Sequence, residues 1–190
     1  QKYIGNEGDV PRIHKMGGRD WAKVVTKAKK SIDDLADKLV EIYAQREITE
    51  GFAFLPDQPW QQEFEDAFPY EETEDQLQAT AEIKASMEKP VPMDRLLAGD
   101  VGFGKTEVAM RAIFKAVMSG KQVAVLVPTT VLAQQHFQTF WNRFAPFGVK
   151  VDVLNRFRST SEKKQVLKGV EDGSIDVLIG THSRLNKKVV

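Results

Sequence analysis

A single apolar stripe dominates the pattern of residues near the start of the chain. Apolar side chains recur at spacings of three or four between Val25 and Ile42, and charged side chains occupy the opposite side. This period predicts one long helix from about residue 20 to residue 46. We expect the helix to pack on a body that the rest of the chain supplies, because the run is shorter than four heptads and a coiled coil is less favoured. Before it, glycines and a proline predict that residues 1–20 are irregular.

Residues 51–92 divide into shorter pieces. A break containing Pro56 and Pro59 precedes a short helical pattern over 60–67. A second helix is predicted from Thr73 to about residue 87, and a proline-rich run closes it. This part of the chain is therefore predicted to be helical.

After residue 92 short apolar runs alternate with helical stretches. Strands are predicted at 95–98, 123–127, 151–154 and 177–179, and helices at 105–119, 131–144 and 160–171. Such alternation predicts βαβ units, which build a parallel sheet with helices on both faces. The predicted fold class is α/β, with a mainly helical N-terminal segment before the sheet.

The distribution of charge adds one feature to this picture. The formal net charge is zero, but residues 1–50 sum to +1, residues 51–93 to −8 and residues 94–190 to +7. The C-terminal part is therefore suited to meet a polyanion, although separate solvated faces would produce the same counts.

Composition excludes several kinds of site. The chain has no cysteine, so it forms neither disulfides nor thiolate metal sites. Its three histidines are scattered without metal-ligand spacing. No apolar run is long enough to span a bilayer and no signal-peptide pattern is present, so we expect a cytoplasmic location and no membrane contact.

One motif carries specific chemistry. The run from Gly99 to Thr106, Gly-Asp-Val-Gly-Phe-Gly-Lys-Thr, has P-loop spacing and lies between a predicted strand and a predicted helix. Its glycines let backbone N–H groups point inward around an anion, and the helix start adds partial positive charge. Lys105 is expected to reach the β- and γ-phosphates, and the Thr106 hydroxyl to bind magnesium. Simple turn glycines are the alternative, and a P-loop does not by itself name the base.

The run Phe68-Pro69-Tyr70-x-x-Thr73-x-x-Gln76 permits two interpretations. Thr73 and Gln76 have the spacing of a capping box, which would start the next helix without any ligand. The Gln76 amide also offers the donor and acceptor that adenine requires, with Phe68 or Tyr70 stacked on the base. Both interpretations can hold together.

Three loops are predicted to meet at one edge of the sheet. The P-loop, residues 128–130 and residues 180–182 each follow a predicted strand, and the carboxyl ends of parallel strands share one edge. Hydroxyls and free N–H groups there suit a nucleic-acid phosphate, although Thr129 or Thr130 could equally be a plain helix cap. Arg156 and Arg158 add positive charge after the third strand, where an isolated cluster is more often a solvated face.

Together the motifs resemble the first motor domain of superfamily-two DNA translocases, and within them the branch that couples transcription to DNA repair. The resemblance covers nearly all of the chain. It is carried by residues 93–112, 125–130 with 132–136, 156–158 and 179–182 in the motor, and by 14–18, 42–46 and 51–54 upstream. Ala98 stands where the family often has cysteine and Asn155 where it often has serine, and neither change removes a catalytic group.

The resemblance implies a RecA-like P-loop domain that uses ATP and Mg²⁺. ATP hydrolysis in the whole protein would drive translocation on double-stranded DNA, and RNA polymerase and excision-repair proteins would be partners through other parts of a longer chain. Lys105 and Thr106 would be catalytic, with Thr106 the metal ligand. The implied ATP contacts are Phe68, Gln76, Gly99, Asp100, Val101, Gly102, Phe103, Gly104, Lys105, Thr106 and Glu107. The implied nucleic-acid contacts are Thr129, Thr130, Gln134, Arg156, Arg158, Thr181 and His182.

The same resemblance divides the chain into four parts. Residues 1–20 would be the irregular end of a polymerase-interacting module, and residues 21–50 a linking helix. Residues 51–92 would carry the adenine-binding motif, and residues 93–190 the motor lobe. We expect the acidic Walker B motif after residue 190, so that the lobe is truncated and hydrolysis by this chain alone is negligible.

Two alternatives stay open. The chain would be a protein-interaction or regulatory module if its nucleotide site were vestigial and the long helix docked on a partner. A RecG-like DNA helicase has the same motor motifs, so the chain could equally be the motor lobe of such a helicase. The N-terminal segment is not expected in that helicase.

Overall fold

The computed structural model describes residues 18–181, and the chain forms two compact units, Gln1–Thr49 and Glu50–Val190. The predictions for residues 1–17 and for His182 lie outside the described residues. In the first unit, α1 runs from Arg19 to Ile48, which confirms the predicted long helix and extends it by two residues at its end. Among the helices of the described residues, none has the length and apolar character needed to cross a membrane.

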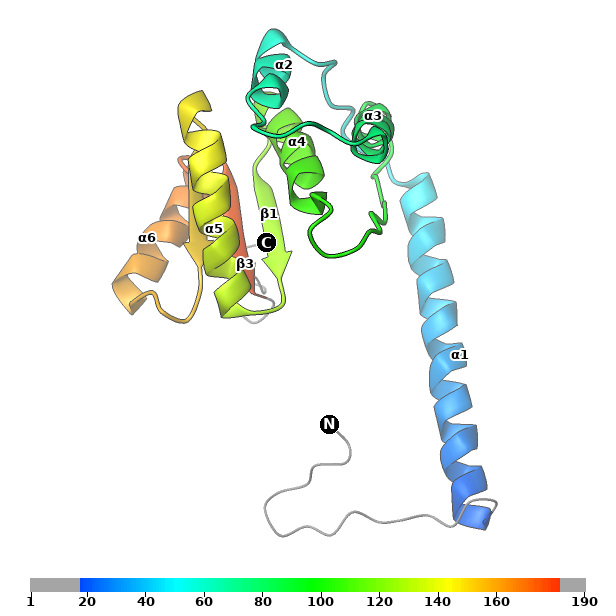
Figure 1. Ribbon diagram of the computed structural model, residues 1–190. Helices are drawn as coiled ribbons and strands as arrows, with labels where there is room; N and C mark the ends of the chain where they lie inside the picture. The colour runs from blue at the N-terminus through cyan, green and yellow to red at the C-terminus, as the bar shows by residue number, and fades with distance from the viewer. Residues whose placement is uncertain (1–17, 182–190) are drawn as a thin grey trace. The chain divides into compact units, whose positions relative to one another are not determined.

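The second unit contains a three-stranded parallel sheet (Figure 1). Its strands are β1 (Val123–Val127), β2 (Val151–Leu154) and β3 (Val177–Thr181), in the order β1-β3-β2. Ile179 in the central strand aligns with Val125 of β1 and Val153 of β2. The predicted parallel sheet with helices on both faces is therefore confirmed.

Alternating residues send the strands' side chains to opposite faces of the sheet. Val153 and Ile179 are buried in the main core with α5 (Thr130–Phe144). Leu154 and Leu178 are buried in a separate cluster with Val166 of α6 (Thr160–Glu171). The parallel strands thus have near-continuous apolar runs because both of their faces are covered.

Three further helices form the part of the unit that carries the P-loop. They are α2 (Pro59–Asp66), α3 (Glu74–Met87) and α4 (Lys105–Met118). Phe64 of α2 stacks on Phe114 of α4 with ring centroids 4.4 Å apart and on Phe144 of α5 at 5.3 Å. On its other side α4 packs against α3 through a small apolar cluster. Helix α4 is therefore fixed between α3 and the main core. The short 3-10 turn η1 (Ala145–Phe147) follows α5.

The strand predicted at residues 95–98 is not a strand in the structure. An extended segment becomes a strand only through a ladder of backbone hydrogen bonds, and β1 forms its ladder with β3. Within the described residues no strand pairs with 95–98. Leu96 is 89% exposed, whereas Leu97 packs on the α3–α4 cluster. The apolar run is present as predicted. Whether such a run becomes a strand depends on a partner strand from another part of the chain, which the run itself does not specify. The last predicted strand is also longer than expected, since β3 continues through Thr181.

The start of the second unit is held against the end of α3. The backbone N–H of Gly51 donates to the carbonyl of Pro90 at 3.1 Å, and Phe54 N–H donates to the carbonyl of Met87 at 3.0 Å. A Cβ on Gly51 would lie 2.6 Å from the nitrogen of Pro92, closer than a side chain allows. Glycine is therefore required where these two segments lie side by side.

Candidate functional site

The P-loop connects the extended run 95–98 to the first turn of α4. Gly102 and Gly104 have φ of 89° and 72°, a region that residues with a Cβ rarely adopt. Gly104 is the N-cap residue, so α4 begins at Lys105 immediately after the turn. The loop residues from Gly99 to Phe103 are exposed. The first backbone N–H groups of a helix have no partner within it, so a helix start directly after this loop suits an anion, as the sequence predicts.

Lys105 is folded over its own loop. Its Nζ donates to the carbonyl oxygens of Gly99 at 2.6 Å and Asp100 at 2.5 Å. An ammonium has three donors, and both carbonyls belong to the loop that would surround the phosphates. Thr106 follows in the first turn of α4, partly exposed. These residues fit a magnesium-bound triphosphate: an exposed cradle, a cation over it and an adjacent hydroxyl. Elsewhere, the described residues contain no group of three or more metal-ligating His, Cys, Asp or Glu side chains.

Gln76 joins the start of α3 to the P-loop. Its Oε1 accepts from Thr73 N–H at 3.0 Å, its own N–H donates to Thr73 Oγ1 at 3.3 Å, and its Nε2 donates to the Phe103 carbonyl at 3.1 Å. The predicted capping box is therefore confirmed. A Cβ on Gly104 would collide with the same amide group. The assignment of Gln76 to adenine stays a prediction.

A cavity of about 200 Å³ opens between α3 and the P-loop. Its lining includes Thr73, Gln76, Gly99, Phe103, Lys105 and Val108. Residues predicted from two separate motifs, one before and one within the P-loop, thus line one space.

Glu107 occupies a different environment from the rest of the motif. It is 6% exposed, and its Oε1 accepts from Arg143 Nη2 at 2.9 Å and from Arg111 Nε at 3.2 Å. Its carboxylate is thus committed to buried ion pairs inside the unit. This cluster was not predicted from the sequence, although the i, i+4 spacing of Glu107 and Arg111 on a largely apolar helix is a signal for it.

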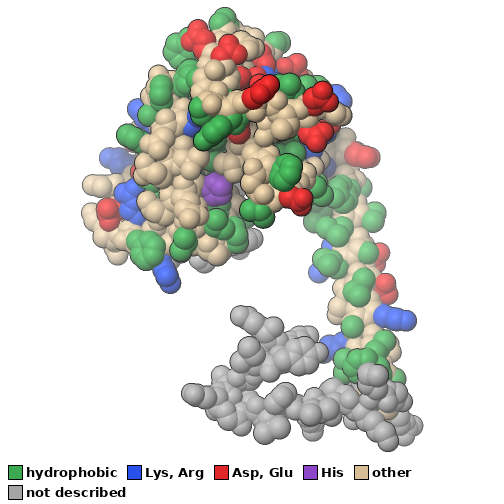
Figure 2. Space-filling view, viewed as in Figure 1, with side chains coloured by type: hydrophobic (Ala, Val, Ile, Leu, Met, Phe, Trp, Pro, Cys, Tyr) green, Lys and Arg blue, Asp and Glu red, His purple; other side chains and the backbone are tan. Residues whose placement is uncertain are grey.

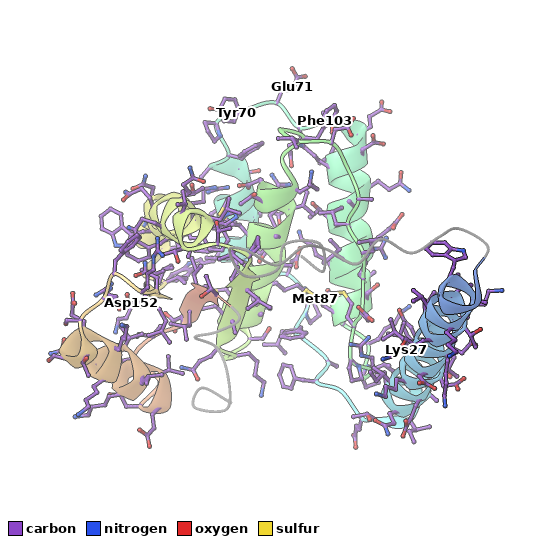
Figure 3. The ribbon with its side chains drawn as sticks, turned by 90° about the horizontal axis from the view of Figure 1, so that it is seen from below. Lys27, Tyr70, Glu71, Met87, Phe103 and Asp152 are labelled. Carbon is purple, nitrogen blue, oxygen red and sulfur yellow. The ribbon has the colours of Figure 1, made fainter. Side chains whose placement is uncertain are left out.

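Phe68 lies against the same cluster. The Arg111 guanidinium carbon is 5.6 Å from the centroid of its ring, and the Tyr70 ring packs edge-on at 5.5 Å. Tyr70 is 74% exposed, and Figure 3 shows Tyr70 and Phe103 along the same side of the molecule. Of the two aromatic candidates, Tyr70 is therefore the more accessible.

A second group of predicted residues gathers where the strands end. Thr129 caps α5 by accepting from Leu132 N–H at 3.2 Å, so the predicted helix cap is confirmed. Thr130 begins the helix. Thr181 aligns with Val127 in the sheet, two residues before Thr129. In Figure 1 the ends of β1 and the starts of α4 and α5 lie on the lower side of the unit. The fold therefore brings the predicted phosphate-contacting loops to the same edge.

The loop after β2 is braced from within. Asn155 is 2% exposed; its Nδ2 donates to Gln134 Oε1 at 3.2 Å and its Oδ1 accepts from Phe157 N–H at 2.9 Å. Arg158 Nη2 donates to Asp152 Oδ1 at 2.6 Å, whereas Arg156 is exposed. The two predicted arginines thus have different environments, since Arg158 braces the loop and Arg156 faces solvent.

Charge is unevenly distributed over the surface. Over the second unit, Figure 2 shows acidic side chains gathered mainly over the upper part, where α2 and α3 lie, and several basic side chains on the left, toward α6. This agrees with the opposite balances of residues 51–93 and 94–190 along the sequence.

A second ion-pair group lies further along α4. Lys115 is 2% exposed, and its Nζ donates to the Leu55 carbonyl, Asp57 Oδ1 and Glu88 Oε1, each at 2.7 Å. Burial raises the pKa of Asp57, but hydrogen bonds from Lys115 and Lys84 outweigh this and hold the pKa below its ordinary value of 3.8. Burial lowers the pKa of Lys115, but its hydrogen bonds to Asp57 and Glu88 raise the pKa above 10.5.

Comparison with known proteins places this arrangement among helicases. Residues 73–190 match the model of the DEAD/DEAH box helicase family. In structure, the chain is similar to RecG bound to a three-way DNA junction, with a TM-score of 0.73 and 37% identity over 77% of this chain and 20% of that one. The RecA-like fold implied by the sequence is thus confirmed.

In sequence, the chain is similar to transcription-repair-coupling factors over its whole length. That of Bacillus subtilis is 54% identical over 190 residues, which is 100% of this chain and 16% of that protein. That of Mycobacterium tuberculosis is 53% identical over 188 residues, 99% of this chain and 15% of that protein. That of Staphylococcus aureus is 49% identical over 189 residues, 100% of this chain and 16% of that protein. The chain therefore spans about one sixth of the length of these relatives.

Proposed function

Because the chain belongs to the DEAD/DEAH box helicase family, we propose that it is the ATP-binding part of a DNA translocase. A helicase domain of this family uses ATP, and magnesium is the usual companion ion. The observation that carries the proposal is the P-loop itself. Helix α4 begins at Lys105 directly after left-handed Gly104, with Lys105 Nζ drawn over the loop. Lys105 would bind the β- and γ-phosphates, Thr106 the magnesium ion, and Gln76 with Phe68 the adenine.

We propose that double-stranded DNA binds at the edge formed by Thr129, Thr130, Gln134, Arg156 and Thr181, with Arg158 beside it. His182, the remaining predicted contact, lies outside the described residues. The basic balance of residues 94–190 supports this, as does the DNA junction bound by the structurally similar RecG. Hydroxyl groups and a helix start position phosphates without reading bases. Binding at this edge would therefore be largely independent of sequence, as translocation requires.

The whole protein, in this proposal, couples transcription to DNA repair by displacing stalled RNA polymerase and engaging repair proteins. The support is the extent of the similarity. The helicase model begins at residue 73, yet the coupling factor of Bacillus subtilis matches all 190 residues. The RecG match covers 77% of the chain at 37% identity, so the full-length match at 54% identity favours a coupling factor over a RecG-like helicase. A cytoplasmic location is part of the same proposal.

The catalytic candidates in this chain, Lys105 and Thr106, bind phosphate and metal. Neither orients the attacking water, a role that other residues take in phosphoryl transfer. We therefore propose that the isolated chain binds ATP without appreciable turnover, and that hydrolysis is a property of the whole protein.

Titration of the 190-residue chain with MgATP tests the nucleotide assignment. Lys105→Ala is expected to weaken ATP binding by about tenfold or more, since a charge-assisted phosphate contact is lost. Lys121→Ala, an exposed lysine beyond the end of α4, serves as the control and should bind normally. Equal affinities for the Lys105→Ala variant and the unsubstituted chain would favour a regulatory module with a vestigial site. In the whole protein, the Lys105→Ala change should abolish DNA-stimulated hydrolysis.

A further inference from the structure

The clearest unexplained feature of the second unit is a set of four paired charges outside the P-loop, two of them buried and two partly exposed. It consists of Glu72, Glu107, Arg111 and Arg143, with two positive and two negative side chains. Arg111 is 2% exposed and Glu107 is 6% exposed. Buried charges are costly unless paired and hydrogen-bonded, so the position of each one is strongly restricted by the others.

Arg111 is the member that contacts both sides of the nucleotide site. It lies in α4, the helix that starts with Lys105 and Thr106, and its Nε donates to Glu107 Oε1 at 3.2 Å. Its Nη1 donates to Glu72 Oε1, and its guanidinium group lies beside the Phe68 ring. One side chain thus links the phosphate-binding helix to residues 68–73, which we call the base-side segment.

The base-side segment has no regular structure of its own. Residues 68–73 belong to neither helix nor strand, and the segment ends at Thr73, the cap residue of the helix that carries Gln76. Phe68 and Glu72 are the residues of this segment whose contacts with α4 are described above, and both contact Arg111. Arg111 Nη2 has no hydrogen-bond partner among the described residues. The Phe68 ring and the carboxylates of Glu72 and Glu107 therefore orient the guanidinium group, although one of its nitrogens makes no hydrogen bond.

The distance between base and phosphates in a nucleotide is limited by its covalent structure, so the two halves of its site must be held at a matching separation. We propose that Arg111 is a positioning residue that holds the base-side segment at the correct distance from the P-loop. Arg111 is not among the residues that line the cavity beside the P-loop, so it would act through Phe68 and Glu72. The part of this inference that concerns a nucleotide base rests on the proposed function. The link between Arg111 and residues 68–73 rests only on the contacts with Phe68 and Glu72.

Lys115 provides a matched control. It is another buried cation on the same helix, one turn further along, and is 2% exposed like Arg111. Its partners are Leu55, Asp57 and Glu88, none of which belongs to the base-side segment. Arg111→Met and Lys115→Met therefore remove the same kind of buried charge, and only the first removes the link to residues 68–73.

The test measures affinity of the 190-residue chain for MgATP and for inorganic tripolyphosphate, which has the phosphates but no base. Arg111→Met is expected to weaken ATP binding on the order of tenfold while tripolyphosphate binding changes by less than about twofold. Lys115→Met should change neither. Arg111→Lys should recover part of the loss, because it restores a charge without the planar fork. Equal weakening of both ligands by Arg111→Met, or the same pattern in Lys115→Met, would overturn the proposal.

Hydrogen–deuterium exchange separates this inference from the proposed function. Without ligand, Arg111→Met should raise deuterium uptake in residues 68–73, and Lys115→Met should raise it near residues 55–57 instead. If the unsubstituted chain binds neither ligand, the proposed function fails, and unchanged uptake at 68–73 in Arg111→Met then refutes the positioning role as well. Should Arg111→Met not fold, Glu72→Ala breaks the same link from a side chain that is 29% exposed, with the same expected pattern.

Discussion

The Nε2 atom of Gln76 donates a hydrogen bond to the carbonyl oxygen of Phe103 at 3.1 Å, which joins the first turn of α3 to the tip of the P-loop. The same side chain closes the capping box with Thr73. One glutamine therefore has a structural role through its oxygen and a role at the candidate site through its nitrogen, and the two roles are separable by substitution.

Gln76→Glu should keep the capping box and lose the contact with the P-loop. A carboxylate oxygen still accepts from Thr73 N–H, but it cannot donate to Phe103 or to adenine. We expect an unchanged free energy of unfolding, within about 0.5 kcal/mol, and clearly weaker ATP binding.

Gln76→Ala should lose both roles and destabilise the chain by about 1 kcal/mol in urea unfolding. Gln78→Ala is the control, since Gln78 lies on the exposed side of the same helix and bonds to Glu82. If Gln76→Glu bound ATP as well as the unsubstituted chain, Gln76 would be a cap and nothing more.

Gly104→Ala should destabilise the chain and weaken ATP binding together. Its φ of 72° costs a residue with a Cβ about 1–2 kcal/mol, and the added Cβ would also collide with the Gln76 amide. Gly120→Ala isolates the first effect, because Gly120 has a φ of 75° and a Cβ there would have no atom within 4 Å. Urea unfolding of both variants measures the two losses of stability, and we expect Gly104→Ala to lose more than Gly120→Ala. Equal losses would mean that the Gln76 amide moves away from the new Cβ without cost.

Arg156→Ala and Arg158→Ala should separate DNA binding from loop stability. Arg156 is exposed, so its loss should weaken duplex DNA binding and reduce the salt slope by about 1 without changing the unfolding midpoint. Arg158 is paired with Asp152, so its loss should cost up to about 1 kcal/mol of stability. Fluorescence anisotropy at several salt concentrations measures the first effect. Lys168→Ala, in the last turn of α6, should leave both quantities unchanged. An Arg156→Ala variant with unaltered salt dependence would remove this arginine from the DNA surface.

Asp57→Asn should weaken the chain at neutral pH but not in strong acid. Because the folded-state pKa of Asp57 lies below 3.8, its stabilisation is present above that value and is lost as pH falls through the folded pKa. The difference between the unsubstituted chain and the variant should be on the order of 1 kcal/mol at pH 7, since solvent screens a partly exposed pair. It should shrink toward zero as pH falls below 3.8 and through the folded-state pKa of Asp57.

The pKa of Lys115 in the folded chain is raised above 10.5. The stabilisation from its ion pairs is therefore present below pH 10.5 and is lost as pH rises through the folded-state pKa. Asp66→Asn, at an exposed position bonded to Gln62, is the control for Asp57→Asn. A difference that stays constant from about pH 7 down to the acid unfolding of the chain would contradict the assigned pairing.

The sequence predicted the features that depend on local pattern. The helices were correct to within about two residues, because apolar period and capping residues such as Thr73 and Thr129 are encoded nearby. The parallel sheet and the common edge followed from the alternation of strand and helix. The strand at 95–98 was wrong, since pairing depends on a partner distant in sequence.

The site was predictable to a smaller extent. The P-loop glycines, Lys105 and Thr106 were recognised from spacing, and the structure places Gln76 beside them as the motif suggested. The link between Arg111 and Glu72 was not predictable, because it joins residues 39 positions apart on elements whose packing is decided by the Phe64–Phe114 core. Burial also distinguishes Glu107 from its motif neighbours, and the i, i+4 spacing with Arg111 is its one local signal.

The pairing of Gly51 with Pro90 leaves little room for a side chain just after α1. Helix α1 ends at Ile48, and the first backbone hydrogen bonds that tie the following chain to the end of α3 are those of Gly51 and Phe54. Because a Cβ on Gly51 would collide with the backbone of residues 91–92, any larger residue there would push this segment away from residues 87–92, a few residues upstream of the P-loop.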